Sequence, residues 1–290
     1  MILLIEMNTD WNIRGKTVFI TGATDGIGKA AALALARRGA HIVFTARTKE
    51  KAEVLKADIM ASGGKVEYLL CDLASFASIK NCVTEFLMSH NALHVLINNA
   101  GVMPVERKAS SDEIELNMAV NYFAPVLLTE LLLPLLIYSK PARIVEVTSS
   151  LHNRGTINLG DLKGVGLYNR YAAYSTSKLA LMLYTLDLAK SLPAGVVANA
   201  VHPGWIRTKL ARGALGKSSF LTKLLLPLKM RTPAYGARSI VHLAADPGAG
   251  GLNGTYVIKK EPTEPSVRAR DEVLGRQLVK ETKKILAPYL

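Results

Sequence analysis

The sequence predicts an α/β fold: a single domain built on a doubly wound parallel sheet of about seven strands, with helices on both faces. Three observations predict it. Short apolar runs of strand length alternate with stretches of helical character, and a glycine-rich turn at 21–28 follows the first run. The third observation is length: 290 residues suit one large α/β domain, and no internal repeat, low-complexity tract or linker interrupts them.

Each element follows from a local pattern. The first strand, 16–20, is an apolar run between Gly15 and Gly22, as expected for a buried parallel strand. The helix at 30–36 ends at Arg37-Arg38-Gly39, where cations are followed by glycine. Further strands are predicted at 41–46, 66–71, 93–97, 142–148, 196–201 and 254–258. Further helices are predicted at 126–137, from about residue 171 and from about residue 264.

The glycine-rich turn lies between a strand and a helix, where a dinucleotide-binding turn is expected in a Rossmann-like fold. Gly22 permits the tight turn, and Gly26 and Gly28 let the backbone approach a pyrophosphate. The helix N-terminus then offers free N–H groups to the phosphates. The alternative is that these glycines only punctuate a loop, and the strand–turn–helix context argues against it.

The second strand ends at Ala46 and is followed by Arg47. An acidic residue at this place accepts a hydrogen bond from the ribose of NAD, whereas an Arg suits the 2′-phosphate of NADP. Because no carboxylate stands at the strand end, we favour NADP(H) over NAD(H). The alternative is that Arg47 is an ordinary surface cation.

Two further strands end in polar residues. Asp72, followed by Leu73, can accept from an adenine amine or can cap the helix that starts near Ser75. Asn98, in Asn98-Asn-Ala-Gly101, can hold the cofactor or stabilise the strand end. Both places are carboxyl ends of parallel strands, where ligands bind in open α/β sheets.

The candidate catalytic residues follow the fifth strand. Tyr174 and Lys178 are four residues apart, so they share one face of a helix. A neighbouring ammonium favours the phenolate and brings the Tyr174 pKa toward the range in which the phenol exchanges a proton with a substrate. Ser149, at the strand exit, can polarise a carbonyl oxygen, and Ser150 competes for that role. The alternative is that Tyr174 and Lys178 lie on a half-exposed helix face without a catalytic role, with the Lys178 side chain extended along the surface so that its ammonium reaches solvent.

These motifs resemble the short-chain dehydrogenase/reductase family over roughly residues 14–256. The matching residues are Thr21, Gly22, Gly26, Ile27, Gly28, Asp72, Asn98, Asn99, Ala100, Gly101, Asn121, Ser149, Tyr174, Lys178, Pro203 and Gly204. The long stretch between Ser149 and Tyr174, with its Asn158-Leu-Gly-Asp-Leu162, and the end of the chain resemble the retinol-dehydrogenase-like branch.

The resemblance implies a set of site residues. The catalytic group would be Asn121, Ser149, Tyr174 and Lys178, with Asn121 linked to Lys178 through a water. The cofactor would contact Gly22, Thr24, Asp25, Gly26, Ile27, Gly28, Arg47, Asp72, Leu73, Asn98, Ala100, Gly101, Tyr174, Lys178, Pro203, Gly204 and Thr208. Asp25 departs from the pattern, because many NADP-using relatives carry a basic or neutral residue there.

The resemblance also divides the chain. Residues 14–150 form mainly the cofactor-binding half and 151–258 mainly the catalytic and substrate half, with a substrate lid at 204–232 and a helical extension at 259–290. It implies a homo-oligomer, for which the apolar helix 126–137 is a candidate contact.

Charge is concentrated in one segment. Residues 204–232 hold seven of the lysines and arginines and no acidic residue, and the chain has a net charge of +13. The basic, leucine-rich stretch 217–231 could contact an anionic membrane surface, or it could be a lid over an apolar substrate. It lacks the interleaved aromatic residues of single-strand nucleic-acid binders, so no nucleic-acid partner is expected.

We expect a cytoplasmic protein without a metal. Cys71 and Cys82 have no metal-ligand spacing, and the six histidines are scattered along the chain. The apolar start at 1–5 is too short for a signal segment or a membrane span. The helix 126–137 contains Glu130 and Pro134 and is about half as long as a membrane span.

The sequence therefore predicts an NADP(H)-dependent oxidoreductase that interconverts an apolar alcohol and its aldehyde or ketone. One alternative is an NAD-linked dehydrogenase of steroid-like alcohols. Another is a cofactor-binding regulatory protein without turnover.

Overall fold

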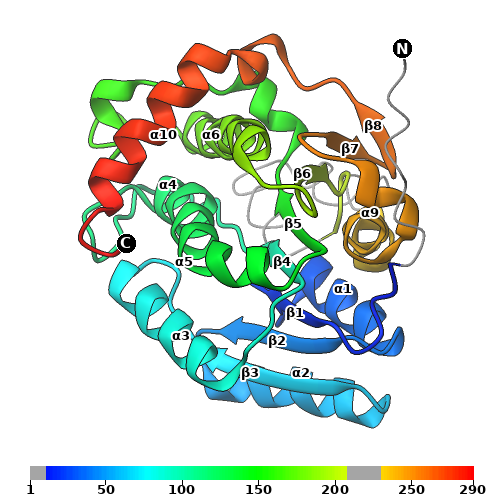
Figure 1. Ribbon diagram of the computed structural model, residues 1–290. Coiled ribbons are helices and arrows are strands. Elements are labelled where there is room, and N and C mark those ends of the chain that lie inside the picture. The colour runs from blue at the N-terminus through cyan, green and yellow to red at the C-terminus, as the bar shows by residue number, and fades with distance from the viewer. Residues whose placement is uncertain (1–10, 208–229) are drawn as a thin grey trace, which may run out of the picture.

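A computed structural model describes residues 11–207 and 230–290 of the chain (Figure 1). Its strands form one sheet of order β3-β2-β1-β4-β5-β6-β7-β8. They are β1 (Thr17–Ile20), β2 (His41–Ala46), β3 (Lys65–Leu70), β4 (Val95–Asn98), β5 (Ala142–Val147), β6 (Val196–His202), β7 (Tyr256–Ile258) and β8 (Glu261–Thr263). The neighbours from β3 to β7 pair in parallel, which confirms the predicted doubly wound fold.

Helices cover both faces of this sheet (Figure 1). One layer holds α1 (Gly26–Arg37), α2 (Lys49–Ala61) and α9 (Pro233–Ala245), and the other holds α3 (Phe76–Ser89), α5 (Ala124–Tyr138), α6 (Arg170–Ser191) and α10 (Glu272–Leu286). Every residue of β1, β2, β4 and β5 is buried, because side chains on both sides of these strands meet a helix layer.

The end of the sheet differs from the prediction in two respects. Seven strands were expected, but an eighth, β8, pairs antiparallel with β7. Lys259 and Lys260 connect the two strands with φ of 53° and 75°, a two-residue turn that matches the twist of a hairpin. The expected helix start near residue 264 is also wrong, because α10 begins at Glu272 with Asp271 as its N-cap. A 3-10 helix, Val267–Arg270, lies between β8 and this helix.

The apolar helix in the middle of the chain is longer than predicted. α4 (Leu116–Met118), a π-helical turn (Ala119–Phe123) and α5 form a continuous run. By length and composition this run, Leu116–Tyr138, is the one described helix that could cross a membrane, and 67% of its most apolar window is buried. Burial of this extent is what the core helix of a folded α/β domain shows.

α10 closes the layer that contains α5 and α6 (Figure 1). The Tyr122 hydroxyl lies 2.7 Å from Thr282 Oγ1, both fully buried, and Lys283 Nζ lies 2.9 Å from Glu130 Oε2. The C-terminal helix therefore covers part of the helix that the sequence nominated as a dimer face, and homo-oligomer formation stays a prediction.

Candidate active site

The glycine-rich turn joins β1 to α1 at the carboxyl edge of the sheet. Gly22 and Gly26 have φ of 65° and 56°, a backbone conformation that glycine adopts without strain. A Cβ on Gly28 would overlap the Gly22 carbonyl and the Asn99 side chain, and one on Gly22 would lie 2.7 Å from Ala100 Cα. The turn is therefore packed as tightly as a phosphate-binding cradle requires, and its residues fit a bound dinucleotide.

Asn99 holds this turn to the end of β4. Its Nδ2 donates to the carbonyl oxygens of Thr21 and Gly22 at 2.9 and 3.1 Å. Thr21 Oγ1 in return accepts from the backbone N–H groups of Asn99 and Ala100, each at 3.1 Å. Sequence reasoning quoted Asn99 only as part of a motif and missed that it joins the two loops. Asp25 is the N-cap of α1, and its Oδ1 accepts from Gly26 N at 2.7 Å.

The residues expected at the adenosine end lie at the ends of β2 and β3. Arg47 is exposed immediately after β2, and Asp72 is exposed beyond β3 with Leu73 half-buried beside it. Asp72 Oδ1 accepts from Ala74 N at 3.0 Å. The alternative that Asp72 caps α3 is wrong, because Ser75 is the N-cap and accepts from Ser78 N.

Asn98 does not face the cofactor turn. Its side chain is buried, and its Nδ2 donates to Glu146 Oε1 at 2.8 Å and to Thr129 Oγ1 at 3.1 Å. Of the two roles considered for Asn98, the geometry matches stabilisation of the strand end. Ala100 and Gly101, which follow, are half-buried.

Glu146 is a buried carboxyl that sequence reasoning missed. It lies in β5, is 0% exposed, and burial raises its pKa to about 7 despite hydrogen bonds from Asn98 and Thr129. Its charge acts on Lys178, whose pKa it raises against the effect of burial. The only signal in the sequence was that Glu146 is the one acidic residue in the strand.

Ser149 and Tyr174 meet at the end of β5. Ser149 caps a 3-10 helix (Ser150–Arg154) by accepting from Leu151 N at 3.2 Å. Tyr174, in the first turns of α6, is 8% exposed, and burial raises its pKa to about 12 while its hydrogen bond with Ser149 opposes that rise. Ser150 instead donates its backbone N–H to His202 Nδ1 at 3.3 Å. Burial lowers the pKa of His202 to about 4, so it is neutral.

Lys178 lies one turn beyond Tyr174, on the same face of α6. Its Nζ donates to the Val147 carbonyl at 2.8 Å and lies 5.9 Å from the centroid of the Tyr174 ring. Burial lowers the Lys178 pKa to about 8. The Tyr174 pKa therefore lies above its usual value, because burial of the phenol outweighs the hydrogen bond with Ser149, and the expected lowering by Lys178 is not among the effects on it in this structure.

Asn121 lies in the π-helical turn and is fully buried. Its Oδ1 accepts from Val102 N at 2.8 Å, and its Nδ2 donates to the Val102 carbonyl and to Ser177 Oγ, each at 3.0 Å. Asn121 thus joins the loop after β4 to the helix that carries Lys178. π-turns of this kind are frequent at functional sites.

Pro203 and Gly204 follow β6, and both are half-buried. Gly204 has a φ of 91°, which requires glycine. Thr208 lies outside the described residues, as does most of the predicted lid and of the basic stretch 217–231.

Comparison with known proteins agrees with this arrangement. A family model described as short chain dehydrogenase matches residues 16–217. The chain belongs to this family. It is an oxidoreductase of the retinol-dehydrogenase-like kind: bovine retinol dehydrogenase 12 is 41% identical over 93% of this chain and 86% of that protein.

Two further relatives bear on the ligands. Human polyprenol dehydrogenase is 37% identical, over 91% of this chain and 82% of its own length. A short chain dehydrogenase from Burkholderia cenocepacia in complex with NADP has a TM-score of 0.69 and 26% identity, covering 85% of this chain and 97% of that one. The solved complex supports a nicotinamide cofactor for this dehydrogenase.

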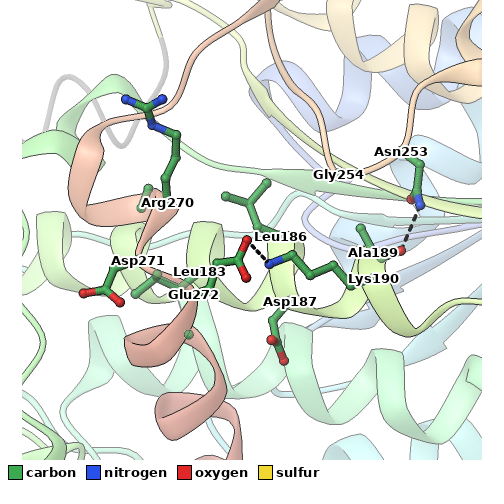
Figure 2. A pocket seen from close by; sticks show the side chains of 12 residues that line it. Leu183, Leu186, Asp187, Ala189, Lys190, Asn253, Gly254, Arg270, Asp271 and Glu272 are labelled. Carbon is green, nitrogen blue, oxygen red and sulfur yellow. Dashed lines mark hydrogen bonds and ion pairs between the residues drawn. The ribbon is translucent and has the colours of Figure 1, made fainter. Parts of the chain in front are cut away.

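A separate groove lies between α6 and the segment 269–275 (Figure 2). Its volume is about 440 Å³, and none of its lining residues is a predicted site residue. Several of its polar groups are already paired: Lys190 Nζ lies 2.8 Å from Glu272 Oε1, and Asn253 Nδ2 donates to the Ala189 carbonyl at 2.8 Å (Figure 2). Because these groups are already satisfied, we assign the groove no ligand.

Proposed function

We propose that this dehydrogenase is an NADP(H)-dependent enzyme that interconverts an apolar alcohol and its aldehyde or ketone. The observation that carries the proposal is the meeting of Ser149, Tyr174 and Lys178 beside the end of β5. These three groups supply a proton donor, a hydrogen bond to the substrate oxygen and a buried positive charge, which is what reduction of a carbonyl needs.

In the reductive direction Tyr174 donates the proton. A pKa of about 12 keeps the phenol protonated at neutral pH, so it is ready to give a proton to a developing alkoxide. Ser149 donates a hydrogen bond to the same oxygen and orients it. Lys178 is charged below about pH 8 and stabilises the phenolate that remains. NADPH held by the glycine turn, Lys178 and the residues after β4 and β6 would supply the hydride.

Asn121 has a positioning role in this proposal. Its bonds to Val102 and Ser177 fix the loop after β4 against α6, on which Tyr174 and Lys178 lie. A water relay between Asn121 and Lys178, which the family resemblance implies, would return the proton from solvent.

The substrate class is inferred from apolar side chains that are exposed in the segments after β4, β5 and β6, and from the relatives. Large apolar side chains are exposed in segments that follow the strand ends, at Val105, Leu167, Tyr171 and Trp205. The Tyr168 hydroxyl donates to the Pro104 carbonyl at 2.6 Å and holds two of these segments together. Together with relatives named for retinol and polyprenol, these exposed apolar side chains support a long apolar substrate.

NADP(H) rather than NAD(H) is proposed because Arg47 is exposed directly after β2, where the ribose is expected, without a carboxylate at the strand end.

Tyr174→Phe tests the proposed chemistry. Oxidation of NADPH with retinal should fall by a factor on the order of 10² to 10⁴, while NADPH binding is retained. Tyr138→Phe is the matched control, because Tyr138 is the last residue of α5, is 81% exposed and should leave the rate unchanged. A Tyr174→Phe rate like that of the wild type would overturn the assigned role.

A panel of carbonyls tests the substrate class. Preference for NADPH with retinal over small aldehydes is the expected result, and preference for NADH with ketosteroids would favour the steroid-type alternative. Tight NADPH binding without turnover on any carbonyl would favour the alternative that this is a cofactor-binding regulatory protein.

A further inference from the structure

Two histidines and a glutamate meet at the sheet edge opposite the catalytic residues. His41 is the first residue of β2, Glu67 lies in β3, and His90 is the C-cap of α3. Figure 1 shows α3 beside these two strands. Among residues 11–207 and 230–290, this is the one group of three His, Cys, Asp or Glu side chains that lie close enough to bind one metal ion.

The ligand atoms are spaced as a metal site requires. His41 Nε2 lies 2.8 Å from Glu67 Oε1, His90 Nε2 lies 3.7 Å from Glu67 Oε2, and all the ligand atoms lie within 4.8 Å of one another. Atoms bound tetrahedrally to one zinc ion at about 2.1 Å are about 3.4 Å apart. Small side-chain rotations therefore suffice to place all three on one ion.

His90 is held with one ring nitrogen directed toward the cluster. Its Nδ1 lies 3.2 Å from the Phe86 carbonyl, and its ring stacks on Phe86 with centroids 4.5 Å apart and an interplanar angle of 11°. A metal-binding histidine commonly donates its second nitrogen to a carbonyl in this way, which leaves Nε2 as the ligand.

His41 has an unsatisfied nitrogen in the cluster. The residue is 7% exposed, and its Nε2 is buried without an aligned hydrogen bond although Glu67 is near. His41 Nε2 is therefore the atom through which this side chain would bind an ion.

The surroundings allow a cation to enter and to be held. The Glu67 side chain is 48% exposed, which leaves an opening for the ion and for a water ligand. The negative end of α3 lies at His90 and favours positive charge. The Lys65 ammonium would repel a bound cation. However, Lys65 is exposed at the start of β3, so its side chain can extend into solvent.

We propose that His41, Glu67 and His90 bind a divalent cation of the zinc class, with water as the fourth ligand. The ion would fasten the end of α3 to β2 and to the edge strand β3. The sequence predicts no such site, because the three ligands come from separate elements and have no motif spacing. Two imidazoles and one carboxylate suit zinc and exclude a preference for magnesium.

Zinc binding by tag-free, chelator-treated protein tests the site. Calorimetry should give one equivalent of zinc, and zinc but not magnesium should raise the melting temperature. Glu67→Gln and His90→Ala should each weaken zinc binding at least about 10-fold and abolish the shift. Glu67→Gln is the decisive variant, because it keeps the size of an exposed side chain, whereas His90→Ala also removes the stack on Phe86.

The control is His242→Ala. His242 Nδ1 lies 2.8 Å from Asp246 Oδ2, so it represents another histidine–carboxylate pair outside the cluster. Cobalt substitution separates the proposed ligands from Cys71 and Cys82, because thiolate ligands would add charge-transfer absorption. The proposal is overturned if zinc does not bind, if Glu67→Gln binds it as tightly as the wild type, or if the cobalt spectrum reports thiolate.

Discussion

Asn98 donates its amide to Glu146 Oε1 at 2.8 Å across the two central strands β4 and β5. The opposite oxygens of this pair, Asn98 Oδ1 and Glu146 Oε2, are buried without a hydrogen-bond partner. A carboxyl is thus held in the middle of the sheet with half of its hydrogen-bonding capacity unused. Its pKa of about 7 reflects that position and couples it to the charge of Lys178.

Glu146→Gln should change the pH dependence of stability. The folded-state pKa of about 7 is above the usual value of 4.5, so the folded protein binds the proton more tightly than the unfolded chain does. Stability therefore falls as the pH rises from 4.5 through 7, by about 3 kcal/mol at most. The glutamine side chain cannot ionise, so the variant should lose this decrease in stability with rising pH.

Melting temperatures at pH 5 and pH 8 measure the effect. Relative to the wild type, Glu146→Gln should gain stability at pH 8 compared with pH 5. Gln also keeps an oxygen for Asn98 Nδ2 and adds an N–H for the unpartnered Asn98 Oδ1. An unchanged difference between the two pH values would show that Glu146 is ionised in the folded protein at pH 5.

Gly28→Ala should reduce NADPH affinity about 10-fold or more, because the added Cβ pushes the Gly22 carbonyl and Asn99 out of the cradle. Fluorescence titration of NADPH measures the loss. Gly248→Ala is the control, since its Cβ would meet nothing within 4 Å. Equal affinities in the two variants would place the cofactor elsewhere.

The alternation of apolar runs was enough to predict the parallel sheet, and helix periodicity placed Tyr174 and Lys178 on one face of α6. The direction of the side chains was harder to predict. Asn98 ends a strand, where a ligand-binding residue is expected, yet its side chain donates a hydrogen bond to Glu146 within the sheet. Similarly, the Tyr174 pKa depends on how deeply the phenol is buried, which no spacing reveals. β8 was missed because its three residues, Glu-Pro-Thr, carry no strand pattern.

Arg47→Asp should weaken NADPH binding by about 10- to 100-fold and favour NADH in relative terms, because a charged hydrogen bond to the 2′-phosphate is replaced by repulsion. Dissociation constants for both cofactors give the ratio. Arg37→Asp, at the far end of α1, makes the same change in net charge at another exposed cation. If both variants lose NADPH affinity equally, Arg47 acts through the overall charge rather than by contact.

Thr282→Val should destabilise the protein by about 1 to 3 kcal/mol, because it leaves the fully buried Tyr122 hydroxyl without its partner in α10. Lys283→Met, one residue later, removes the ion pair with Glu130 at a side chain that is 47% exposed and should cost at most about 1 kcal/mol. Chemical denaturation of the two variants compares a buried hydrogen bond with a surface ion pair on the same helix turn. Equal losses would mean that α10 is held by its apolar side chains alone, and that Tyr122 finds another partner when Thr282 is removed.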